Sequence, residues 1–200
     1  PPRSTLFPYT TLFRSIEFFA LRAPAVAAAQ TAAARRRLIE ALPTTDPPLA
    51  SEYDVALRRS QSEMQHIRAC GDYPLLGHGD LNLYALFVER AVALTSPHGR
   101  TGLLTPSGIA SDAGSQRFFQ TMTEAGRLLE FIDIENRKVF FPEVHSSFKF
   151  AVSVFAGSPV AAGEARCAFF IHDLAELGDS ERVFSLTPSD FALFNPNTRT

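Results

Sequence analysis

The sequence predicts an α/β fold in which a pair of helices precedes a sheet built with crossover connections. Residues 16–67 are rich in alanine and other helix-forming residues. Short apolar runs occur at 102–105, 128–134 and 148–155, and helical patterns precede the first run and separate it from the second. Strands that alternate with helices in this way are typical of an α/β sheet.

The first residues are expected to be artefactual. The eleven residues from Thr5 to Ser15 (TLFPYTTLFRS) read, in order, like the translation of a common short-read sequencing adapter. Segments of this kind are excluded from fold reasoning. We therefore treat residues 1–15 as adapter-derived and expect residues 16–200 to be an internal fragment of a longer protein.

Two helices are predicted before Gly71. The first ends at the proline-rich segment 43–48, because proline cannot continue a helix interior and restricts the residue before it. A second helix is expected from about Ala50 to Ala69. The pair is predicted to form a helical hairpin with one charged, solvated face.

Two further helices have terminal signals. Asp80 is a candidate N-cap for a helix that continues to about Leu94. Ser111 or Asp112 is expected to cap a helix that ends near Gly126, since glycine is the usual residue after a helix. A short helix is also predicted at residues 188–194.

The apolar runs at 102–105, 128–134 and 148–155 are predicted strands, and the last two read LLEFIDI and FKFAVSVF. A further strand is predicted at 166–172 (RCAFFIH). We expect it to pair with the strand at 148–155 across the loop between them.

Composition indicates a globular protein. Hydrophobic residues make up 46% of the chain and charged residues 20%, and no apolar run approaches the roughly 20 residues that span a bilayer. The net charge of −2 argues against a nonspecific polyanion binder. Cys70 and Cys167 stand far apart and outside metal-binding spacings. We expect no membrane role, no metal site and a cytoplasmic location.

Four blocks of sequence stand in a characteristic order: Gly79 to Val92 (GDLNLYALFVERAV), Gly99 to Ile109 (GRTGLLTPSGI), Phe131 to Pro142 (FIDIENRKVFFP) and Phe148 to Gly157 (FKFAVSVFAG). Together they resemble the second half of the N6-adenine DNA methyltransferase core. More closely, the chain looks like the large bacterial restriction-modification methylases of the type IIG kind. An Ala/Arg-rich helical insertion like Glu17 to Leu42 and an ending like Phe194 to Thr198 (FNPNT) are also found in that group.

This resemblance implies a partial Rossmann-like sheet that uses S-adenosylmethionine. It implies a helical insertion at 16–72, the C-terminal half of the methyltransferase domain at 73–175, and the start of a linker toward a recognition region at 176–200. The full protein would methylate a flipped adenine in double-stranded DNA. Because the family's Asn/Asp-Pro-Pro-aromatic loop is missing, the fragment itself is expected to be inactive.

The resemblance also assigns roles to single residues. Phe141 matches the ring that stacks on the flipped adenine, although a core phenylalanine is an equal alternative. Phe87 matches the ring beside the cofactor's adenine, and its alternative is ordinary helix packing. Asp80 and Asn82 either support that cofactor pocket or only cap the helix.

Four other residues are expected to support the site. Pro106 and Ser107 follow a predicted strand, at the end where open α/β sheets bind ligands. Pro142 follows Phe141 directly. Lys149 is a candidate phosphate contact near the flipped base, with an ordinary surface lysine as the alternative.

Two other functions remain open from the residues alone. One is a related Rossmann methyltransferase that acts on protein or RNA. The other is a non-catalytic interaction fragment in which Phe87 and Phe141 belong to the core.

Overall fold

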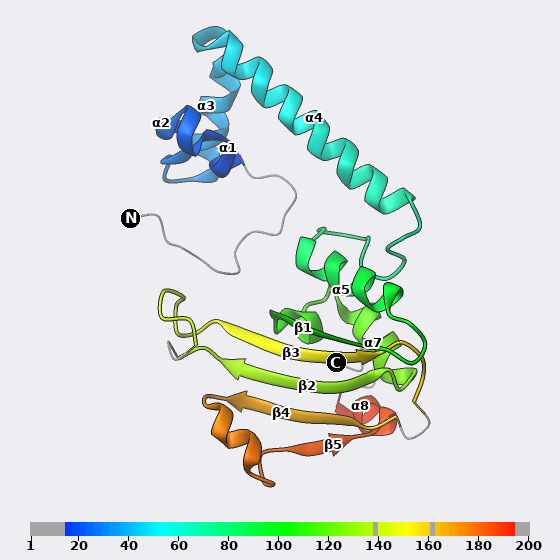
Figure 1. Cartoon of the computed structure of the whole chain (residues 1–200). Coiled ribbons are helices and arrows are strands. Elements are labelled where there is room, and N and C mark those ends of the chain that lie inside the picture. Colours follow the sequence, from blue (N-terminus) through cyan, green and yellow to red (C-terminus); the bar gives the residue numbers. More distant parts are fainter. Residues whose placement is uncertain (1–14, 138–139, 161–162, 195–200) are drawn as a thin grey trace. The chain divides into compact units, whose positions relative to one another are not determined.

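The computed structural model describes residues 15–137, 140–160 and 163–194 (Figure 1). The adapter-like segment, apart from Ser15, and the FNPNT ending, apart from the backbone of Phe194, lie outside these ranges. The described residues form two compact units, a helical unit that ends at Gly71 and a sheet unit that begins at Asp72. Among the described residues, no helix is long and apolar enough to cross a membrane.

The helical unit contains four helices: α1 (Ser15–Arg22), α2 (Pro24–Ala27), α3 (Ala32–Thr45) and α4 (Pro47–Ala69). The predicted hairpin is formed by α3 and α4. The break falls at Asp46, whose side chain accepts a hydrogen bond from the Leu49 N–H at 3.1 Å and caps α4. The second helix therefore begins at Pro47 instead of Ala50, because proline is well tolerated at the first helical positions.

A small core holds these helices together. Phe19, Val26, Leu42 and Leu49 are buried in it. The ring of Tyr53 stacks on Phe19, with the ring centroids 5.0 Å apart. This core lies within the helical unit, which therefore has an apolar centre separate from that of the sheet.

The sheet has five strands in the order β1-β3-β2-β4-β5. Their bounds are β1 (Arg100–Pro106), β2 (Leu128–Glu135), β3 (Lys149–Ala156), β4 (Ala165–Ile171) and β5 (Phe184–Leu186). β3 is antiparallel to both β1 and β2, while β2 and β4 are parallel. One end of the sheet thus contains the carboxyl ends of β1, β2 and β4 together with the start of β3 (Figure 1).

All four predicted strands are present, but one predicted pairing is wrong. The strand at 166–172 was expected beside the strand at 148–155, whereas β4 pairs in parallel with β2. Both edges of β3 are already hydrogen-bonded, to β1 and to β2. β4 therefore cannot lie beside β3; it pairs with the outer edge of β2, and β5 then adds to β4.

The helix α5 (Leu83–Leu94) begins later than predicted. Its N-cap is Asn82, which has an extended backbone and a side-chain oxygen that accepts from the Tyr84 N–H at 3.3 Å. The prediction that Asp80 caps the helix is wrong, because a cap side chain reaches only the second or third helical residue and Asp80 lies too far upstream.

The helix predicted after Ser111 begins later than expected, so the prediction that Ser111 or Asp112 caps it is wrong. α6 (Gly108–Ser111) ends where the prediction starts, and α7 (Gln116–Glu124) has Ser115 as its N-cap. The predicted glycine stop is confirmed: Gly126 has a φ of +60°, and its N–H bonds to the Thr123 carbonyl at 3.0 Å. This is the left-handed ending for which glycine is favoured.

The last described elements belong to the sheet unit. The range 176–200, for which the sequence predicts the start of a linker, contributes β5 and α8 (Pro188–Phe194), and the 3-10 helix η1 (Leu174–Gly178) precedes them. Phe191 of α8 packs against Phe119 of α7, with ring centroids 6.0 Å apart. Helices α7 and α8 together cover one face of the sheet.

The two cysteines give a direct test of this fold. Cys70 is exposed, whereas Cys167 lies in the centre of β4 and is completely buried. Burial, with a smaller contribution from the charge of Glu130, raises the pKa of the Cys167 thiol to about 12. A thiol-reactive disulfide reagent at pH 8 should modify Cys70 rapidly and Cys167 only after denaturation, and rapid modification of both would contradict the fold.

Candidate functional site

The connection between β2 and β3 is organised by one buried side chain, Asn136. Its Nδ2 donates to the carbonyls of Phe141 at 2.8 Å and Val144 at 3.0 Å. Its Oδ1 accepts from the Phe141 N–H at 2.9 Å. Asn136 is only 1% exposed, so its three side-chain hydrogen bonds replace water for the loop backbone.

The loop fixes the position of Phe141. Its half-buried ring meets Phe150 edge to face, with centroids 5.2 Å apart. Phe140 meets the same Phe150 ring at 5.5 Å. Both rings pack against the buried face formed by Ile132 and Ile134. The ring of Phe141 is thus packed on one side and remains partly exposed.

Asp80 and Asn82 line one pocket at the start of α5. The pocket has a volume of about 500 Å³, and Tyr84, Asp112 and Ser115 also contribute to it. The Tyr84 hydroxyl is hydrogen-bonded to the side chains of Asp112 and Ser115. Burial and then the nearby Asp112 charge raise the pKa of the Tyr84 phenol to about 12, so it stays neutral at physiological pH.

Phe87 lies on α5 but does not line this pocket. Its side chain is 72% exposed, while its neighbours Leu86 and Val88 are buried. Phe87 therefore does not pack in the core of the described chain.

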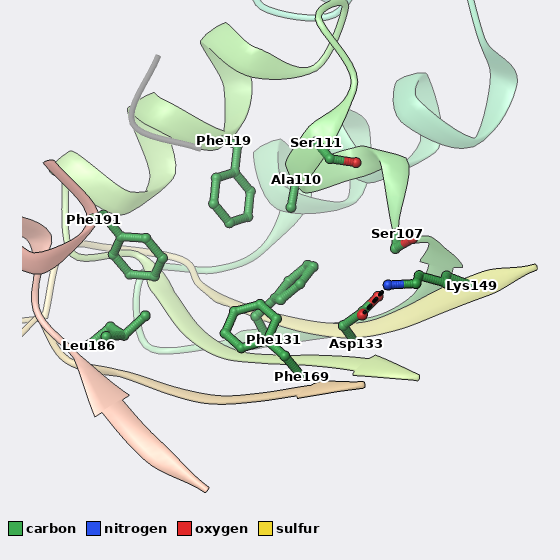
Figure 2. Close-up of a pocket in the computed structure, with 10 residues that line it drawn as sticks. All are labelled: Ser107, Ala110, Ser111, Phe119, Phe131, Asp133, Lys149, Phe169, Leu186 and Phe191. Atoms are coloured by element: carbon green, nitrogen blue, oxygen red, sulfur yellow. Dashed lines mark ion pairs between the residues drawn. The ribbon is translucent and has the colours of Figure 1, made fainter. Parts of the chain in front are cut away.

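A second pocket, of about 360 Å³, contains two of the predicted supporting residues, Ser107 and Lys149 (Figure 2). Its apolar part is formed by the side chains of Ala110, Phe119, Phe131, Phe169, Leu186 and Phe191. At the other end lie Ser107, Ser111 and the ion pair between Asp133 and Lys149. Pro106, Phe141 and Pro142 line neither pocket.

Lys149 is part of an ion-pair network at the edge of the sheet. Its Nζ lies 3.5 Å from Asp133 Oδ2 and 3.7 Å from Glu135 Oε1, and 3.7 Å from the centre of the Phe170 ring. Hydrogen bonds from His172 and Arg137 lower the pKa of Glu135, with Lys149 adding a smaller effect. The charge of Lys149 is thus largely compensated by carboxylates of its own sheet.

The structure also explains an Asp-Pro-Pro sequence at residues 46–48. It matches three of the four positions of the catalytic loop named above, but Leu49 takes the aromatic place. These residues form the cap and first turn of α4, and Leu49 is buried in the helical unit. They serve as a helix start.

The sequence alone does not single out three groups that matter in the fold: Asp133 and Tyr84, which line the two pockets, and Asn136, which holds the backbone of Phe141. Asn136 was passed over because it lies inside a block noted for its phenylalanines. Asp133 was read only as part of a strand, and Tyr84 only as part of a helix face. Within the described ranges, no group of three or more His, Cys, Asp and Glu side chains is placed to hold a metal ion.

These features define a mixed α/β sheet domain with pockets near the strand ends and an aromatic residue presented by the β2–β3 connection. Residues 60–140 match the family model of the Eco57I restriction-modification methylases. The match includes Asp80, Asn82, Phe87, Pro106 and Ser107, and it ends one residue before Phe141. The resemblance to restriction-modification methylases is therefore supported over that range. No curated protein matches the chain.

Proposed function

We propose that this chain is the C-terminal half of the catalytic domain of a site-specific DNA adenine-N6 methyltransferase from a restriction-modification system. The observation that carries the proposal is the match of residues 60–140 to the Eco57I restriction-modification methylases. The mixed sheet supports it, as does the hydrogen bonding of Asn136 to Phe141 and Val144 in the described part of the β2–β3 connection. The proposed partner is double-stranded DNA, which is bound by the full-length protein.

The target-base side of the proposal rests on Phe141. An adenine inside a duplex must be flipped out before its N6 atom can react, and an aromatic ring compensates part of the lost stacking. Phe141 has a half-buried ring, a backbone held at both its N–H and its carbonyl, and the exposed Pro142 beside it. A ring fixed in this way is pre-organised to stack on a base.

The cofactor side rests on α5. The residues present fit a nucleoside in part: Phe87 offers an exposed ring, and Asp80 and Asn82 border a pocket at the start of the same helix. When bound, S-adenosylmethionine supplies the methyl group. Asp80 would accept hydrogen bonds from the ligand, while Asn82 already uses its side-chain oxygen to cap α5. We propose Pro106 and Ser107 as supports at the carboxyl end of β1, and Lys149 as a support through its ion pairs.

The 200-residue chain by itself should not methylate DNA. No Asn/Asp-Pro-Pro-aromatic tetrapeptide occurs in it, and the Asp-Pro-Pro at 46–48 is a helix start. Adenine N6 is a poor nucleophile, so correctly placed acceptor oxygens are required. We propose that the full-length protein supplies them from outside these residues.

The proposal predicts a specific effect of Phe141→Ala in the full-length protein. Loss of base stacking, worth about 1–3 kcal/mol, should lower kcat/KM for duplex methylation roughly ten-fold or more. The fluorescence of 2-aminopurine placed at the target adenine should also fall toward that of the stacked duplex, or change its lifetime distribution. Phe141→Trp should keep most of both signals.

Phe140→Ala is the matched control. Phe140 contacts the same Phe150 ring at a similar distance, so its loss tests packing without the proposed base contact. If Phe140→Ala and Phe141→Ala reduce methylation and alter the 2-aminopurine signal equally, Phe141 acts through packing alone and the assigned role is wrong.

A further inference from the structure

The pocket that contains Asp133 and Lys149 lies on the other face of the sheet from Phe141. Alternate residues of a strand point to opposite faces, so Phe131 and Asp133 of β2 face away from Ile132 and Ile134. Phe141 packs with Ile132 and Ile134, whereas Phe131 and Asp133 line the 360 Å³ pocket under α6, α7 and α8. Of the residues that line this pocket, the proposed methyl transfer names only Ser107 and Lys149, as supports, and it places neither the cofactor nor the flipped adenine here.

The pocket has an aromatic part that suits a flat ring. Phe119 and Phe131 meet edge to face at 5.6 Å, and Phe191 and Phe169 extend the cluster at 6.0 Å on either side. Figure 2 shows these rings grouped away from Asp133 and Lys149. A volume of about 360 Å³ lies within the roughly 300–1,000 Å³ range of small-molecule sites.

The polar end of the pocket holds a carboxylate with unused hydrogen-bonding capacity. The Asp133 side chain is only 8% exposed, and its one partner in the described part of the chain is Lys149 at 3.5 Å. No hydrogen bond to its oxygens is present among those residues, although a carboxylate has about four acceptor positions. Buried polar groups normally have such partners, so the carboxylate is suited to a donor that enters through the pocket.

Lys149 does not satisfy the free acceptor positions of the Asp133 carboxylate. Its ammonium is shared between Asp133, Glu135 and the face of the Phe170 ring, which leaves it beside Asp133 instead of bonded closely to it. Arg137 and His172 bond to Glu135 and not to Asp133. The Ser107 and Ser111 hydroxyls border the same end of the pocket and can accept hydrogen bonds from further N–H groups of a ligand.

We propose that this pocket binds a small planar aromatic molecule that carries an amino or amidinium group, with its ring among Phe119, Phe131 and Phe169 and its N–H donors on Asp133. An anionic aromatic molecule is disfavoured, because its charge would face the buried Asp133 carboxylate, while the Lys149 ammonium is already shared among Asp133, Glu135 and the Phe170 ring. A cation without a ring loses the apolar contact.

The test uses the 200-residue chain and three probes: benzamidine, benzoate and guanidinium. Titrations followed by amide NMR shifts and by calorimetry should give benzamidine about ten-fold tighter binding than either of the other two. Asp133→Asn should weaken benzamidine binding about ten-fold. Ala110→Leu should abolish it by filling the pocket, and this variant keeps the test valid if Asp133→Asn does not fold.

Glu130→Gln is the matched control. Glu130 lies on the same strand and pairs with Arg166, but it does not line the pocket, so benzamidine binding should be unchanged. Equal affinity for benzamidine and benzoate would overturn the proposal, as would binding that survives both Asp133→Asn and Ala110→Leu. Because no methyl transfer is measured, the outcome is independent of the proposed function.

Discussion

Replacing Asn136 by alanine is expected to lower the stability of the β2–β3 connection by about 2–4 kcal/mol, since each buried group left without a partner costs about 1–3 kcal/mol. The Phe141 N–H and the Val144 carbonyl lose the Asn136 side chain as their partner, and the Phe141 carbonyl keeps only the bond from the Val144 N–H at 3.0 Å. Hydrogen exchange at the Phe141 and Val144 amides should become about 100-fold faster. In the full-length protein, the rate of DNA methylation should fall along with the protection of these two amides from hydrogen exchange.

Asn82→Ala is the comparison for this result. Asn82 makes one cap bond to Tyr84 at 3.3 Å, so its loss should cost only about 1 kcal/mol. Asn136→Asp keeps the acceptor for the Phe141 N–H but places a carboxylate against two carbonyl oxygens, and it should be as harmful as alanine at pH 7. Unchanged exchange at Phe141 in Asn136→Ala would refute this account of the loop.

Replacing Gly157 by alanine is expected to destabilise the sheet unit by about 3 kcal/mol, because overpacking against backbone cannot relax by rotating a side chain. An added Cβ would lie 1.8 Å from the Ser96 carbonyl oxygen and 2.7 Å from its carbon. The N–H of Gly157 also bonds to the Gly99 carbonyl at 3.0 Å. The end of β3 and the turn before β1 would both have to move.

The measurement is thermal unfolding combined with the reactivity of Cys167, which reports on the sheet unit alone. Gly157→Ala should lower Tm by about 10 °C and expose Cys167 to thiol reagents at a correspondingly lower temperature. Gly178→Ala is the control, since no atom lies within 4 Å of its added Cβ. A melting temperature for Gly157→Ala equal to that of Gly178→Ala would show that the close approach to Ser96 is not present.

Local sequence signals were sufficient for most of the elements. The runs LLEFIDI and FKFAVSVF became β2 and β3 with bounds shifted by one residue at most, because buried strands are recognised from short apolar runs. The predicted helix at 188–194 has the bounds of α8. Helix starts were less accurate: Asn82, not Asp80, caps α5, since several polar residues in the segment before it are plausible caps.

Long-range pairing could not be predicted from the same signals. The placement of β4 depends on β3 having two partners already, which no local pattern records. The Asp133–Lys149 pair likewise follows from the register that sets Asp133 opposite Ala151 and Glu135 opposite Lys149. Residues on the same face and two positions apart across neighbouring strands then come within reach.

The candidate site was predictable only where it follows a family pattern. The resemblance selected Asp80, Asn82 and Phe87 within the matched range, and it selected Phe141 just beyond it. It gave no indication that Phe87 would be 72% exposed, or that Asn136 would hold the Phe141 backbone. Exposure and side-chain hydrogen bonding depend on the assembled fold.

The most direct test of the proposed function is the identity of the methylated product. The full-length protein that contains residues 16–200 should be incubated with isotopically labelled S-adenosylmethionine and duplex DNA, RNA or protein, and the products analysed by mass spectrometry. We predict labelled N6-methyladenine in the DNA at a fixed sequence, and none with the 200-residue chain alone. Label in protein or RNA instead, or no transfer by the full-length protein, would contradict the account.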